Sequence, residues 1–165
     1  MLIKFFLGVA IVAFTSFCGY LLARKYRQRM LFFQQFYTFN ERFLSEIAYY
    51  RRPIQAFISQ YTFEGQFNEF LSEVFIEREE NMQIEGVFAK SDKYTFLNKE
   101  DRKVATDYFC MLGKGDSASQ KCYFSSMKEK LSQLRKDTEI QAKQYVDLYI
   151  KLGFLCGLLV LILIV

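Results

Sequence analysis

The sequence predicts an all-α protein, with a cytoplasmic helical bundle between an N-terminal and a short C-terminal transmembrane helix. Three observations lead to this fold class. Each end of the chain carries a long uncharged apolar run. Between the two runs, apolar residues recur at steps of three and four, which is the spacing of one helix face. No stretch offers a convincing strand. A length of 165 residues leaves room for one domain core beside the two ends.

The N-terminal segment, residues 1–23, is expected to cross the membrane. From Phe5 to Ala23 it has neither a charge nor a proline, and its length is close to the roughly 20 residues that span a bilayer as a helix. A cleaved signal peptide is the alternative. However, no small-x-small site ends the run, and Phe17 stands where a lipoprotein-type site before Cys18 requires a small residue.

A basic cluster fixes the expected orientation. Arg24, Lys25, Arg27 and Arg29 follow the apolar run, whereas only Lys4 precedes it. Because basic residues concentrate on the cytoplasmic side, we expect residues 24–147 to form a cytoplasmic domain. The cluster also accounts for the net charge of +4, so the sequence does not predict nucleic-acid binding.

The C-terminal segment, residues 148–165, is a shorter membrane candidate. Its purely apolar part, Leu152–Val165, reaches only about 21 Å as a helix, against roughly 30 Å of hydrocarbon. It therefore needs help from a snorkelling Lys151 or from a partner helix. Gly153 and Gly157 allow close helix packing in lipid, which also admits a homo-oligomer. The alternative is a buried helix of a soluble core.

The region between the ends is expected to form consecutive amphipathic helices. Pro53 disfavours helical geometry in the residue before it, so the first helix should stop near Arg52. The further helices are expected from Pro53 to an end at Gly65, over Phe67–Phe75, as a short helix and a loop within 81–98, from Asn98 to about Leu112, and from Ser117 into the C-terminal segment. The last of these carries a continuous apolar stripe of Phe124, Met127, Leu131, Leu134, Tyr145, Leu148 and Leu152.

The turn before this long helix is expected to be structural. Gly113-Lys114-Gly115-Asp116 resembles a nucleotide-binding loop only superficially, because Tyr108 and Gly115 replace the glycine and the Ser or Thr that such a loop requires. Ser117 and Gln120 stand at capping-box spacing, and Asp116 can cap or brace the turn. The residues predicted to form the structural turn and helix cap are Leu112, Gly113, Asp116, Ser117 and Gln120.

The composition gives little support for catalysis. Histidine is absent, which excludes Ser-His and Cys-His nucleophiles. No Cys-x-x-Cys pair exists, and we expect reduced thiols, with a disulfide between Cys110 and Cys122 only if the domain lies outside the cytoplasm. The acidic group of Glu77, Glu79 and Glu80 is interpreted as solvated surface. We therefore predict no catalytic residue, no cofactor and no metal.

Aromatic residues favour a component of an assembly instead. The chain has 19 phenylalanines and 11 tyrosines, which predicts an aromatic core and some exposed aromatic surface of the kind that contacts proteins or membranes. The rival hypothesis is a membrane-bound enzyme that uses buried carboxylates such as Glu46 and Asp116.

Two segments resemble the stage III sporulation protein AB family of endospore-forming bacteria. The segment LGKGDSASQK carries Leu112, Gly113, Asp116, Gln120 and Lys121 at the positions of the family's turn, ahead of the long helix and the apolar ending. In EIAYYRRPIQAF, the matching residues are Glu46, Ile47, Tyr49, Pro53 and Ala56. The sequence departs from the family's pattern at Tyr50, Phe109 and Gly115.

The resemblance implies a helical domain like the cytoplasmic domains of type II secretion F proteins. It also implies a non-catalytic scaffold in the channel complex between mother cell and forespore, in the cell membrane as a multi-pass protein whose domain faces the mother-cell cytoplasm. The expected partners are the lipid bilayer, a stage III sporulation AA-type ATPase and other membrane proteins of the complex. Lys121 is a candidate partner contact. The alternative is a platform component of a secretion or pilus system unrelated to sporulation.

Overall fold

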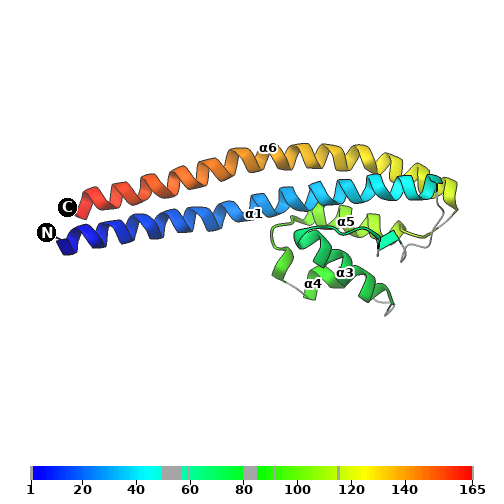
Figure 1. Cartoon of the computed structure of the whole chain (residues 1–165), viewed down its shortest axis with the longest axis horizontal. Coiled ribbons are helices and arrows are strands. Elements are labelled where there is room, and N and C mark those ends of the chain that lie inside the picture. The colour runs from blue at the N-terminus through cyan, green and yellow to red at the C-terminus, as the bar shows by residue number, and fades with distance from the viewer. Residues whose placement is uncertain are drawn as a thin grey trace. The chain divides into compact units, whose positions relative to one another are not determined.

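The computed structural model describes residues 2–49, 57–58, 60–79, 85–90, 92–114 and 116–164. All regular structure in these ranges is helical, as predicted. The elements are α1 (Leu2–Tyr49), α3 (Gly65–Glu79), α4 (Glu85–Lys90), the 3-10 helix η1 (Asp92–Tyr94), α5 (Lys99–Met111) and α6 (Ser117–Ile164), shown in Figure 1.

The chain forms two compact units. One combines Met1–Gln28 with Thr138–Val165, and we call it the helix-pair unit; the other, Arg29–Asp137, is the core unit. Equal numbers of basic and acidic residues fall within the core unit, so the net charge of +4 belongs to the helix-pair unit. The domain boundaries expected after residues 23 and 147 remain predictions.

Aromatic side chains fill the core unit, as the composition predicts. Phe36 of α1 is fully buried, stacks on Phe67 of α3 at a centroid distance of 5.5 Å, and meets the ring of Tyr108 of α5 edge-on at 4.8 Å. Phe43 of α1 meets Phe124 of α6 edge-on at 5.0 Å. Each such pair contributes about 0.5–1.5 kcal/mol beyond its buried area. Four helices therefore meet through rings.

The connection before α3 differs from the prediction. Phe57, Ile58 and Gln60 are helical, but residues 61–64 are not, and Gly65 begins α3 instead of ending the preceding helix. In this non-helical segment the guanidinium of Arg42 lies over the rings of Tyr61 and Phe63, at 4.9 and 5.4 Å. Gly65 has a φ of 64°, which glycine adopts most readily. The stop expected near Arg52 lies outside the described residues.

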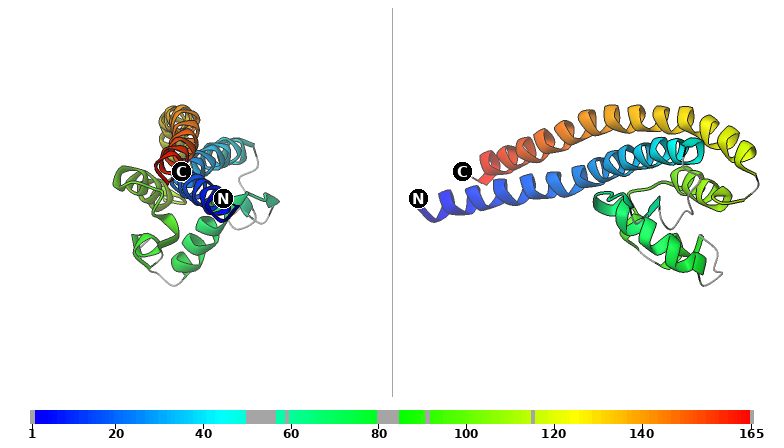
Figure 2. Two further views of the ribbon diagram at one scale, coloured as in Figure 1. Left: turned by 90° about the vertical axis from the view of Figure 1, so that its left-hand side faces the viewer. Right: turned by 45° about the vertical axis from the view of Figure 1, so that its right-hand side comes forward.

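The apolar stripe predicted along α6 is buried in the core unit and exposed in the helix-pair unit. Phe124, Met127 and Leu131 are buried, but in the helix-pair unit Tyr145, Leu148 and Leu152 are 37%, 47% and 45% exposed. The buried positions described there are small residues, namely Gly8, Gly19 and Ala23 of α1 and Thr138, Ala142 and Gly157 of α6. Within this unit α1 and α6 run side by side in opposite directions (Figure 1 and Figure 2). Small side chains let the two helix backbones approach closely.

One helix among the described residues is long and apolar enough to cross a membrane, the stretch Ala118–Ile162 of α6. This finding agrees with the expected C-terminal segment. The N-terminal span remains a prediction.

Candidate functional site

The start of α5 is fixed by a cap and an ion pair. Asn98 is the N-cap: its Oδ1 accepts from the amide of Asp101 at 2.7 Å, and Asp101 Oδ2 accepts from the amide of Asn98 at 3.0 Å. This confirms the predicted cap. Arg29 of α1 donates to both carboxylate oxygens of Asp101, at 2.7 and 2.9 Å, and Asp101 is 1% exposed. Arg29, predicted as a topology signal, therefore also ties α5 to α1.

A buried polar network joins the helices α1, α5 and α6. Asn40 of α1 is completely buried, and its Oδ1 accepts from the hydroxyl of Tyr108 of α5 at 2.8 Å. Its Nδ2 donates to the carbonyl of Phe124 of α6 at 3.2 Å. Burial raises the pKa of Tyr108 well above its ordinary value, so this hydroxyl stays a donor. The network fixes the relative positions of α1, α5 and α6.

Hydrogen bonds and one glycine conformation shape the turn after α5. Leu112 is fully buried and closes α5, with its amide donating to the carbonyl of Phe109 at 3.4 Å. Gly113 has a φ of 77°, a conformation in which a side chain is strained. The amide of Lys114 donates to the carbonyl of Met111 at 3.1 Å. These bonds satisfy carbonyls at the end of α5, as in other helix C-terminal turns.

The start of α6 is capped by Asp116 and not by Ser117. Ser117 is the first helical residue, and the carbonyl of Asp116 accepts the amide of Gln120 at 3.0 Å, so Asp116 is the N-cap. The hydroxyl of Ser119 lowers the pKa of the Asp116 carboxyl, with further contributions from backbone amides at the helix start. The side chain of Gln120 donates to the carbonyl of Lys114 at 3.2 Å, and so braces the turn. Aspartate is favoured at the N-cap because its negative charge is stabilised at a helix N-terminus.

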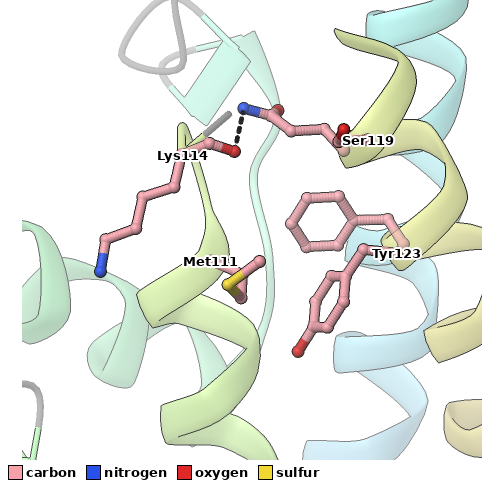
Figure 3. Close-up of a pocket in the computed structure, with 6 residues that line it drawn as sticks. Met111, Lys114, Ser119 and Tyr123 are labelled. Carbon is pink, nitrogen blue, oxygen red and sulfur yellow. Dashed lines mark hydrogen bonds between the residues drawn. The ribbon is translucent and has the colours of Figure 1, made fainter. Parts of the chain in front are cut away.

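A small apolar pocket opens beside this turn (Figure 3). Its volume is about 140 Å³. The side chain of Met111, 40% exposed, points toward the ring of Tyr123, and Phe124 also lines the pocket. The remaining lining comes from Lys114, Ser119 and Gln120. Lys121, the predicted partner contact, is exposed on the first turns of α6 and is not part of the lining.

The two glycines predicted for membrane packing face the chain's own N-terminal helix. A Cβ at Gly157 would lie 2.5 Å from Oγ1 of Thr15 and 2.9 Å from Cα of Val12. A Cβ at Gly153 would lie 2.8 Å from the carbonyl oxygen of Thr15 and 3.3 Å from Cα of Gly19. We call this contact the glycine seam. The glycine seam occupies the face of α6 through which the sequence analysis allows a homo-oligomer to form.

A family model described as stage III sporulation protein AB (spore_III_AB) matches residues 4–165. The chain belongs to this family. The resemblance read from the sequence is confirmed, and membership in the stage III sporulation protein AB family implies a role in sporulation. No curated protein and no solved structure matches the chain significantly. The expected likeness to type II secretion F domains therefore remains a prediction.

Of the two carboxylates considered for an enzyme, only one is buried in this family member. Glu46 is buried at 4% exposure in α1, but Asp116 is exposed and serves as a cap, which removes it from the buried pair that the enzyme hypothesis needs. The side chains of Glu77, Glu79 and Glu80 lie outside the described residues. Where side chains are described, no group of three or more acidic or cysteine residues could hold a metal ion. All four cysteines are free.

Sequence reasoning missed two features of the site in this stage III sporulation protein AB chain. The sequence pattern does not identify Asn40 as a buried residue, because the neighbouring phenylalanines satisfy the helical spacing without it. A polar residue inside an apolar run was the available signal, since such a residue is buried only when it is hydrogen-bonded. The pocket had no signal, because Met111 and Tyr123 come from different helices and meet only in the folded chain.

Proposed function

We propose that this protein is a non-catalytic membrane scaffold of the sporulation channel complex between mother cell and forespore. It positions or couples an AA-type ATPase at the membrane. The observation that carries the proposal is the braced turn between α5 and α6, with its apolar pocket, in a chain whose family serves sporulation.

The turn has the properties of a docking surface. Its backbone is held by the Gln120 side chain and by the conformation of Gly113. The carbonyl of Phe124, a residue of the pocket lining, accepts a hydrogen bond from the buried Asn40. A partner therefore meets a surface that needs little ordering on binding, which favours affinity. Met111 and Tyr123 supply apolar contacts, while Lys114 and Lys121 add exposed positive charge around them.

The helix-pair unit supports the membrane part of the proposal. The short apolar run of α6 lies against the uncharged run of α1 through the glycine seam. A partner helix is what a short span needs to cross the hydrocarbon layer. We infer that both helices span, with the core unit in the cytoplasm, as the exposed Arg24, Lys25 and Arg27 favour.

Deletion of the gene tests the biological role. Spore development should then arrest after engulfment, and the yield of heat-resistant spores should collapse. A normal yield of heat-resistant spores from the deletion strain would refute the role in the channel complex.

Charge reversal tests the docking surface. Lys114→Glu and Lys121→Glu should weaken recovery of the AA-type ATPase in pull-downs from membranes, because each reversal places an acidic group at the proposed contact. Lys136→Glu is the matched control, since Lys136 is exposed on the same helix away from the turn. Equal recovery with all three variants would reject this surface.

A further inference from the structure

A stack of tyrosines stands where the two apolar runs of the helix-pair unit end. Tyr26 of α1 stacks on Tyr145 and Tyr149 of α6, at centroid distances of 4.7 and 5.8 Å. The ammonium of Lys25 lies over the ring of Tyr26 at 5.2 Å. Tyr26 follows the uncharged run of α1 almost directly, and Tyr149 comes just before the apolar run of α6. Two sequence boundaries that are independent of each other thus coincide in space.

The glycine contacts give the distance from this stack to the other end of the pair. A Cβ at Gly8 of α1 would lie 2.8 Å from Cδ1 of Leu161, near the end of α6. From Gly8 to Tyr26 a helix rises by about 27 Å, close to the roughly 30 Å of a hydrocarbon layer. The stack therefore lies at one edge of the layer that the pair can cross. Tyrosine is enriched at this depth, because its ring is apolar and its hydroxyl is polar.

The charges at this edge are unequal between the two helices. In the part of α6 that belongs to the helix-pair unit, Lys143 pairs with Glu139 at 2.9 Å and Lys151 pairs with Asp147 at 2.6 Å. Both cations of that part therefore have an acidic partner. On α1 the exposed cations are Arg24, Lys25 and Arg27. Within the described residues, no ion pair includes any of these three. The positive charge of the unit is thus concentrated on α1, beside the tyrosine stack.

We propose that Arg24, Lys25 and Arg27, seated by the tyrosine stack, bind the headgroups of anionic phospholipids in the cytoplasmic leaflet. This inference rests on the membrane position proposed above. The tyrosines set the depth of α1, and the cations meet the phosphates at that depth. Phosphate groups are the natural partners of Arg and Lys at a membrane surface, and each cation near an anionic surface strengthens binding about five-fold. The occupant is a lipid and not free phosphate, because the stack and the seam place the cations at the edge of the hydrocarbon.

Titration of the full-length protein in detergent with phosphatidylglycerol tests the site, with phosphatidylcholine as the neutral comparison and native mass spectrometry as the readout. The wild type should prefer phosphatidylglycerol. The triple variant Arg24→Gln, Lys25→Gln, Arg27→Gln should bind it at least about ten-fold more weakly. An unchanged preference in this variant overturns the proposal.

A second triple variant controls for net charge. Lys99→Gln, Lys103→Gln and Lys136→Gln remove the same charge from exposed positions of the core unit. This variant should bind phosphatidylglycerol as the wild type does, and an equal loss in both triple variants would overturn the site. Inorganic phosphate at matched ionic strength should not displace the lipid. Displacement would also overturn the proposal, since it would identify a site for free phosphate.

Extraction of membranes with alkaline carbonate separates this inference from the membrane position on which it rests. A protein that carbonate releases is not spanning, and then both ideas fail together. A protein that resists carbonate but shows no preference for phosphatidylglycerol refutes the lipid site alone.

Discussion

Replacement of Asn40 by leucine should destabilise the core unit strongly, although leucine has a similar size and is apolar. Asn40 is completely buried, so the change removes its hydrogen bonds to Tyr108 at 2.8 Å and to the carbonyl of Phe124 at 3.2 Å. The Tyr108 hydroxyl is itself buried and loses its acceptor, which costs about 1–3 kcal/mol, and the second bond adds about 1 kcal/mol. We therefore expect a total loss of about 2–4 kcal/mol.

Thermal unfolding of the full-length protein in detergent, followed by far-UV circular dichroism, measures this loss. For a domain of about 100 residues, 1 kcal/mol lowers the melting temperature by roughly 4 °C, so Asn40→Leu should lower it by about 8–16 °C. Asn68→Leu is the matched control, because Asn68 is exposed on α3, and its effect should stay within about 0.5 kcal/mol.

A double-mutant cycle distinguishes the hydrogen bond from a general packing effect. Tyr108→Phe removes the hydroxyl that Asn40→Leu leaves without an acceptor, so the double variant should be at least about 1 kcal/mol more stable than the sum of the single losses predicts. Simple additivity of the two losses would refute the reasoning that the network is shared.

Three further predictions concern other described contacts. Gly157→Leu should separate the helix pair, because its Cβ would lie 2.9 Å from Cα of Val12; oxidative cross-linking of Tyr26→Cys to Tyr145→Cys should then fall, while the exposed-face control Leu159→Ile keeps it. Arg29→Gln should cost about 3–5 kcal/mol, measured as melting temperature, because it leaves Asp101 buried with its charge unpaired; a loss below 1 kcal/mol would contradict this. Above pH 10 the folded state keeps Tyr108 protonated while the unfolded chain ionises, so stability falls as pH rises; Tyr108→Phe should fall less steeply between pH 10 and 11, and parallel curves would contradict this.

The helices themselves follow from local rules, which is why the sequence predicts most of them. The spacing of phenylalanines in α1 and α3 and the Asn98 cap of α5 are each encoded within a few neighbouring residues. The start of α6 needed a finer choice. Both Asp116 and Ser117 are good caps, and only the structure shows that the aspartate takes the position.

The contacts that the sequence does not predict join residues far apart in the chain. Periodicity of large apolar residues does not show which residues pack within the helix-pair unit, where Tyr145, Leu148 and Leu152 are exposed and the packed face consists of small residues. The spacing of Gly153 and Gly157 predicts close helix packing, but it does not identify the partner, which is the chain's own α1. The neighbours of Arg29 in the sequence indicate a membrane-flanking basic cluster. They do not predict its ion pair with Asp101 of α5.

The glycine seam also sets an order of events in folding. Gly19 belongs to the first helix to be synthesised, but its partner Gly153 follows only after the whole core unit. Contacts between residues so distant in sequence carry a large loop-closure cost, unless the intervening chain has already folded and brought its ends together. We therefore expect the core unit to fold first and the seam to close last. A substitution such as Asn40→Leu would then impair closure of the seam, although Asn40 lies in the core unit and makes none of the seam's contacts.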